Sequence, residues 1–224
     1  MNVRDVCREL ELIGREMSGI IIDTNFCQVG SSVTWGKYKT GIASGVNYLS
    51  QYRKVIDDRQ YSFLLSGGHA LQIYYEWHGN DLIAAKQAIY PAPYVIDGWE
   101  DEWPDFELSE AELLQDPDPE SEAGLDMVRA SCWSHIRFDF DLSAESHDIA
   151  HIQNSSINEF RVPSTIVVPP FMFMVMAVRL LHPAYYETVR ERGWFLEAVA
   201  RAKRQCVKVA VLDTSYPFLS IECQ

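Results

Sequence analysis

Apolar residues recur every three or four positions in several parts of the chain and predict helices there. One amphipathic helix is predicted over residues 2–17, marked by Val3, Val6, Leu10, Ile13 and Met17. The apolar run 167–178 contains Pro169 and Pro170, and proline is tolerated in a first helical turn, so a buried helix is predicted from that point. A short helix is predicted around 46–57. A final amphipathic helix is predicted with an apolar face made of Tyr186, Val189, Gly193, Leu196 and Ala200.

Runs of β-branched and aromatic residues predict strands between these helices. Residues 61–65 and 70–77 flank the turn Ser66-Gly-Gly-His69, and paired glycines suit the positive φ angles of a tight hairpin. A second turn at 77–81 leads into a third strand over 82–90, which ends at Pro91. The result is a three-stranded antiparallel meander. Residues 19–50 are weakly patterned.

The stretch His135-Ile-Arg-Phe-Asp-Phe-Asp141 alternates polar and apolar residues, which is typical of a half-buried strand over 133–141. Ile136, Phe138 and Phe140 are predicted to face the core. The other face then carries His135, Arg137, Asp139 and Asp141. Together the elements predict an α+β fold in one domain, residues 1–224, with an antiparallel sheet packed against C-terminal helices and an N-terminal amphipathic helix.

The polar side of this strand is the candidate site. Asp139 and Asp141 are predicted metal ligands, because two carboxylates on one strand face can converge on Mg²⁺ or Mn²⁺, with Zn²⁺ a weaker fit. Arg137 could neutralise them or bind a phosphate. His147 and His151, four residues apart, are candidates for a general base. The alternative is an ordinary solvated sheet face with cross-strand ion pairs.

No motif for a nucleotide or organic cofactor is predicted. Ser66-Gly-Gly-His69 lacks the lysine and the following helix of a phosphate-binding loop. The sequence has no apolar run long enough for a membrane span. Its first residues carry charges and lack the apolar centre of a signal peptide. The five cysteines are far apart and form no CxxC pair, so we expect a cytoplasmic protein.

Residues 97–126 carry the whole charge imbalance of the chain. The net charge is −13, but this segment contains thirteen acidic residues and no Lys or Arg, which leaves 19 acidic residues against 19 basic ones elsewhere. An acidic pI therefore does not argue against binding to nucleic acid. The composition predicts a solvated, flexible insertion. Its aromatic residues Trp99, Trp103 and Phe106 either pack on their own domain or dock a protein partner.

Four stretches in order, SHIRFDFD, HDIAHIQ, NEFRVP and VPPFMFMVMAVRLL, resemble the bacterial domain of unknown function family number 2290. The upstream stretches YSFLL, ALQIYYEW and AIYPAPY are similar to it as well, so the resemblance spans about residues 55–190. Two positions depart from the family pattern: Asp148 stands where proline is expected, and Phe160 where cysteine is expected. The second departure argues against a cysteine nucleophile there. The resemblance implies that the polar strand and Arg161 belong to a recurring pattern, and it brings no activity.

Two functions fit these observations. One is a metal-assisted phosphodiester hydrolase, nuclease-like, with Asp139 and Asp141 on the ion, His135, His147 or His151 in proton transfer, and Arg137 or Arg161 on the phosphate. Its substrate would be a nucleic acid. The other is a non-catalytic interaction or regulatory subunit that docks a protein through residues 97–126. Bacterial families of this size are common in defence and toxin–antitoxin systems, a setting that fits either function.

Overall fold

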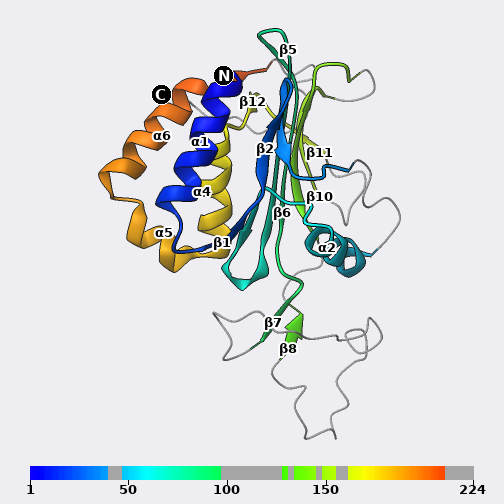
Figure 1. Cartoon of the computed structure of the whole chain (residues 1–224), viewed down its shortest axis with the longest axis vertical. Coiled ribbons are helices and arrows are strands. Elements are labelled where there is room, and N and C mark those ends of the chain that lie inside the picture. The colour runs from blue at the N-terminus through cyan, green and yellow to red at the C-terminus, as the bar shows by residue number, and fades with distance from the viewer. Residues whose placement is uncertain (40–46, 97–127, 131–133, 145–147, 155–160, 210–224) are drawn as a thin grey trace, which may run out of the picture.

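The fold consists of a central antiparallel sheet with helices packed on both of its faces (Figure 1). The computed structural model describes residues 1–39, 47–96, 128–130, 134–144, 148–154 and 161–209. Its helices are α1 (Val3–Glu16), α2 (Tyr48–Asp57), α4 (Pro170–Leu181), α5 (Pro183–Val189) and α6 (Gly193–Gln205). The α+β fold predicted from the sequence is confirmed.

Nine strands of the described residues form one sheet in the order β1-β4-β5-β6-β9-β10-β11, with β2 beside β3 and β3 beside β5. Each pair in it is antiparallel. The strands are β1 (Ile21–Thr24), β2 (Phe26–Val29), β3 (Ser32–Trp35), β4 (Phe63–Leu65), β5 (Ala70–His78), β6 (Asp81–Tyr90), β9 (Ile136–Asp141), β10 (Ala150–Asn154) and β11 (Arg161–Pro163). The predicted meander is therefore present as β4, β5 and β6.

Two small sheets complete the described strands. One pairs β12 (Ile166–Val167) with β13 (Val207–Lys208), next to the start of α4. The other pairs β7 (Tyr94–Ile96) with β8 (Val128–Ala130). Between β7 and β8 runs the acidic segment 97–126, which lies outside the described residues. The two ends of this segment are thus brought together by one pair of adjacent strands.

The main core lies between one face of the sheet and the helices α1, α4 and α6 (Figure 1). Phe138 of β9 meets Phe173 of α4 edge to face, with ring centroids 5.9 Å apart. The opposite face is covered at one end by α2, whose Tyr48, Tyr52 and Val55 pack in a second cluster with strand residues such as Ala88. The rest of this face carries the candidate site.

The C-terminal helical region differs from the single final helix predicted. The structure has α5 and α6 with a break between them, and Arg190 ends α5. The break resets the helical phase, so α6 buries Phe195, Ala198 and Ala202, while Leu196, predicted on the apolar face, is exposed. The predicted face was wrong for this reason in α6, whereas Val189 in α5 is buried as predicted.

The turn between β4 and β5 depends on Gly67. Its φ of 72° is a left-handed conformation, and a Cβ there would lie 3.1 Å from Nε2 of His69. We expect Gly67→Ala to lower the free energy of unfolding by about 1–2 kcal/mol, measured by urea denaturation. Gly14→Ala is the matched control: Gly14 lies inside α1, and a Cβ added there would have no atom within 4 Å, so alanine should stabilise by up to about 1 kcal/mol. Equal effects at the two positions would contradict this account.

Candidate functional site

We call the face of the sheet that points away from α1, α4 and α6 the polar face. Two rows of its side chains make up the site. Directly opposed residues of antiparallel strands lie on the same side of a sheet. The register between β5, β6, β9 and β10 therefore gives a first row of Tyr74, Lys86, Asp139 and His151. The second row is Ala88, Arg137, Gln153 and Arg161.

Asp139 is the centre of the site. One carboxylate oxygen, Oδ1, accepts a hydrogen bond from Nη2 of Arg137 at 3.0 Å. The other, Oδ2, lies 3.9 Å from Nε2 of His151. The Asp139 side chain is 12% exposed and that of His151 is 5% exposed. A carboxylate, an imidazole and a guanidinium thus meet on the polar face with little solvent between them.

The surroundings of His151 fix where its proton lies. Nδ1 is 3.1 Å from the backbone oxygen of Asp148, and a carbonyl oxygen only accepts hydrogen bonds, so Nδ1 carries the hydrogen. In neutral His151 the lone pair is then on Nε2, which faces the carboxylate of Asp139. Both groups accept, so a proton, a water molecule or a cation is needed between them. This arrangement suits either proton transfer or a metal ion.

His135 lies on the predicted face, but it is closed off from solvent. It is 2% exposed and stacks on Tyr90, with ring centroids 4.5 Å apart. Burial, helped by the positive charge of Arg137, lowers its pKa from 6.5 to about 3. A neutral, buried ring of this kind packs the interface between α2 and the sheet. The sequence placed His135 correctly on the face and did not predict that α2 covers it.

The other predicted site residues are distributed as follows. Asp141 shares the face with Asp139, but its Oδ1 accepts hydrogen bonds from the backbone N–H and the hydroxyl of Ser143, at 2.9 and 2.6 Å. Arg161 is exposed on β11, across from Gln153. His147 lies outside the described residues, as do Trp99, Trp103 and Phe106. Asp139, Arg137 and His151 are therefore the predicted residues that come together.

Metal binding has two ligand groups to build on. Among the described residues, no three His, Cys, Asp or Glu side chains converge where they could hold a metal ion. The pair formed by Asp139 Oδ2 and His151 Nε2 offers one oxygen and one nitrogen ligand. Mg²⁺ is commonly held in proteins by one or two carboxylates together with water and substrate phosphates, so two protein ligands are within its usual range.

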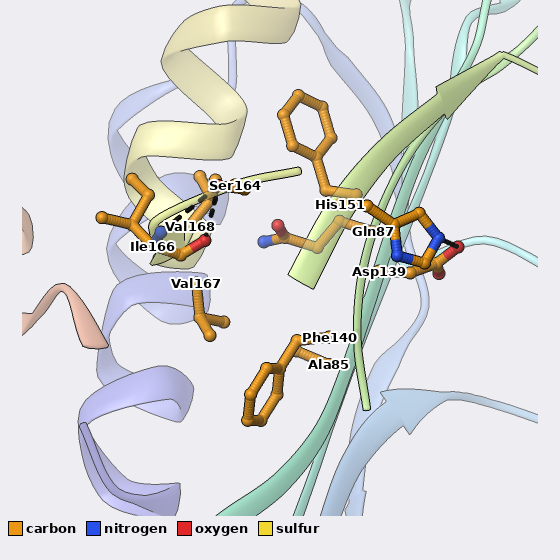
Figure 2. A pocket seen from close by; sticks show the side chains of 10 residues that line it. Ala85, Gln87, Asp139, Phe140, His151, Ser164, Ile166, Val167 and Val168 are labelled. Atoms are coloured by element: carbon orange, nitrogen blue, oxygen red, sulfur yellow. Dashed lines mark hydrogen bonds and ion pairs between the residues drawn. The ribbon is translucent and has the colours of Figure 1, made fainter. Parts of the chain in front are cut away.

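A small cavity of about 10 Å³, room for roughly one water molecule, lies between β6, β9 and β10 and the segment that leads into α4 (Figure 2). Gln87 points into it from β6, toward Ser164 and Val168, and Asp139 and His151 are also among the residues that line it. The Gln87 amide donates to the hydroxyl of Tyr75 at 2.7 Å, and that hydroxyl donates to the backbone oxygen of Val168. These bonds link β5 and β6 to each other and to the residues just before α4.

Three residues of the polar face were not predicted from the sequence. Lys86 stands between Tyr74 and Asp139, is exposed, and has no hydrogen-bond or ion-pair partner among the described residues. Tyr74 and Tyr38 stack on each other with ring centroids 5.1 Å apart. Lys86 and Tyr74 were in predicted strands, but only the register shows that they share a row with Asp139.

The fold and the site define an α+β protein with an Asp–His–Arg cluster on the open face of an antiparallel sheet. The chain matches the model of the family described as "Uncharacterized conserved protein (DUF2290)" over residues 20–220. It therefore belongs to this family, in agreement with the resemblance found in its sequence. A search of curated proteins gave no match. A search of solved structures gave none either. No described helix has the length and apolar character needed to cross a membrane.

Proposed function

We propose that the polar face is the active site of a metal-assisted phosphodiester hydrolase. The observation that carries the proposal is the contact of the Asp139 carboxylate with both Arg137 and His151. Lys86 and Arg161 lie on the same face and are exposed, so cationic groups flank the carboxylate–imidazole pair on both sides. Clusters of ionisable groups with low exposure are common at catalytic sites.

Each residue has a distinct role in this proposal. Asp139 and His151 would hold a divalent cation, which polarises the phosphate and lowers the pKa of a bound water molecule. His151 would hold the cation through the one lone pair of its ring, on Nε2, since its Nδ1 is committed to Asp148, and the proton of the metal-bound water would pass to solvent. Lys86 and Arg161 bind the anionic phosphate oxygens and stabilise the charge that develops on them. Arg137 orients the Asp139 carboxylate.

The test is the hydrolysis of phosphodiesters by the full chain with Mg²⁺, Mn²⁺ or Zn²⁺. Substrates are bis(p-nitrophenyl) phosphate and single- and double-stranded RNA and DNA. We expect Asp139→Asn and His151→Gln to lower kcat by about 100-fold or more, because each removes a ligand of the cation that would activate the attacking water. Both variants should also weaken binding of Mn²⁺, measured by calorimetry without substrate.

Asp81→Asn is the matched control. Asp81 is an exposed carboxylate at the start of the neighbouring strand β6, and it lies outside both rows of the polar face. It should leave both activity and Mn²⁺ affinity unchanged. Absence of hydrolysis with every metal and substrate, or equal activity of native protein and Asp139→Asn, would overturn the proposal.

A further inference from the structure

The polar face carries a pair of stacked tyrosines in line with the Asp139–His151 pair. Tyr38 follows β3 and lies on Tyr74 of β5 with ring centroids 5.1 Å apart and an angle of 21° between the rings. Tyr74 is in the same row as Lys86, Asp139 and His151. Both tyrosines are partly exposed. We call this pair the tyrosine platform.

The tyrosine platform is held in place by its neighbours. The Tyr74 hydroxyl donates to Oε2 of Glu76 at 2.7 Å. Tyr38 meets the buried ring of Trp35 edge to face at 5.0 Å, and the Trp35 indole donates to Gln60 at 3.1 Å. The rings are therefore oriented before any ligand arrives, which reduces the entropy lost on binding.

A cationic group separates the tyrosine platform from the site. Lys86 is directly across from Tyr74 on one side and from Asp139 on the other. Neighbouring strands are about 4.8 Å apart, so Lys86 is about 5 Å and Asp139 about 10 Å from Tyr74 across the sheet. The order along the row is an aromatic surface, a free ammonium group and a carboxylate–imidazole pair.

This order matches the repeating chemistry of a nucleic acid strand, in which flat bases alternate with anionic phosphates. Bases stack on aromatic side chains only when they are not paired and stacked within a duplex. We propose that the ligand of the polar face is a single-stranded nucleic acid, with one base stacked on the tyrosine platform and the adjoining phosphate over Lys86. The position of the bond to be cleaved, beside Asp139 and His151, rests on the proposed function.

The test measures binding in the absence of divalent metal, so that cleavage does not interfere. Fluorescein-labelled DNA and RNA strands of roughly 12 nucleotides are titrated with the full chain and followed by anisotropy. A second DNA strand of the same length has abasic sites in place of its bases and keeps every phosphate. A DNA duplex is the third probe.

We expect the abasic strand to bind between about fivefold and about 100-fold more weakly than the normal strand, the range for loss of one base–aromatic stack. Tyr38→Leu should weaken binding of the normal strand to the same extent and leave binding of the abasic strand nearly unchanged. Tyr38→Phe keeps the ring and is the matched control, with native affinity expected. A preference of the native protein for RNA or for DNA then identifies which of the two it binds.

Equal affinity for normal and abasic strands, tighter binding of the duplex, or no binding of any strand would each overturn the inference. The abasic comparison uses the native protein, so the test does not depend on the folding of a variant. Loss of binding in Tyr38→Leu without any effect of Asp139→Asn on hydrolysis would support the platform and contradict the proposed function. Loss of hydrolysis in Asp139→Asn with equal binding of normal and abasic strands would support the proposed function and contradict the role of the tyrosine platform.

Discussion

The native protein should lose about 4 kcal/mol of its free energy of unfolding through His135 as the pH falls from 6.5 to 3. In the folded protein the pKa of His135 is lowered to about 3, first by burial against Tyr90 and Tyr48 and then by the charge of Arg137. Between pH 6.5 and 3 the unfolded chain therefore binds a proton that the folded protein does not. The contribution is fully present above pH 6.5 and is lost as the pH falls through this window.

His135→Phe tests this prediction. Phenylalanine keeps an aromatic ring on Tyr90 and cannot take up a proton. Urea denaturation at pH 7.5 and at pH 4.5 should show that the native protein loses about 3 kcal/mol more than the variant between these two values. The full difference develops only below pH 3.

Phe138→Leu is the control for a change in packing alone. Phe138 lies three residues further along the chain, in β9, is buried and does not titrate, so its effect on stability should be the same at both pH values. Equal acid sensitivity of the native protein and His135→Phe would show that His135 is not held neutral in the folded protein.

A second buried group, Glu9, should make the protein less stable as the pH rises. Glu9 of α1 is 2% exposed in the core between the helices. Its Oε2 accepts a hydrogen bond from the backbone N–H of Phe171, at the start of α4, at 2.8 Å, and its Oε1 has no hydrogen-bond partner among the described residues. Burial raises the pKa of Glu9 from 4.5 to about 7, although the Phe171 N–H and the charge of Arg201 oppose this rise.

A raised pKa means that the folded protein holds a proton that the unfolded chain releases. The stability that comes from protonated Glu9 is complete below pH 4.5 and is lost as the pH rises to about 7. The loss amounts to about 3 kcal/mol. Glu9→Gln should remove it, because the amide oxygen still accepts from Phe171 and the side chain stays neutral.

The measurement is again urea denaturation, here at pH 4.5 and pH 8. Relative to the native protein, Glu9→Gln should gain about 3 kcal/mol between the two values. Glu11→Gln removes an exposed carboxylate from the same helix and controls for the loss of one negative charge. A stability difference between the native protein and Glu9→Gln that does not change with pH would contradict a protonated Glu9.

The elements that the sequence predicted well are those in which apolar residues recur at a regular spacing. The spacing of Val6, Leu10 and Ile13 marked the buried side of α1, and all three are fully buried. The proline pair marked the start of α4. By contrast, β1, β2 and β3 were not predicted, because each has four residues and some of their apolar side chains, such as Ile22 and Val29, are exposed.

Half of the candidate site followed from alternation along a single strand. Alternation placed Arg137 and Asp139 on one face, and the spacing of the histidines allowed His151 to join them. That His151 meets Asp139 depends on the register of β10 against β9. Lys86 depends in the same way on the pairing of β6 with β9, strands separated by about fifty residues, which no local pattern reports.

The pairing of β7 with β8 has a consequence for how this chain can vary. Because the two strands that flank residues 97–127 are hydrogen-bonded to each other, the ends of this segment are held close together. For a loop closed in this way, added length costs closure entropy. Doubling such a length costs only about 0.6 kcal/mol. We therefore expect insertions between β7 and β8 to be tolerated by the main sheet, in which neither of these two strands takes part.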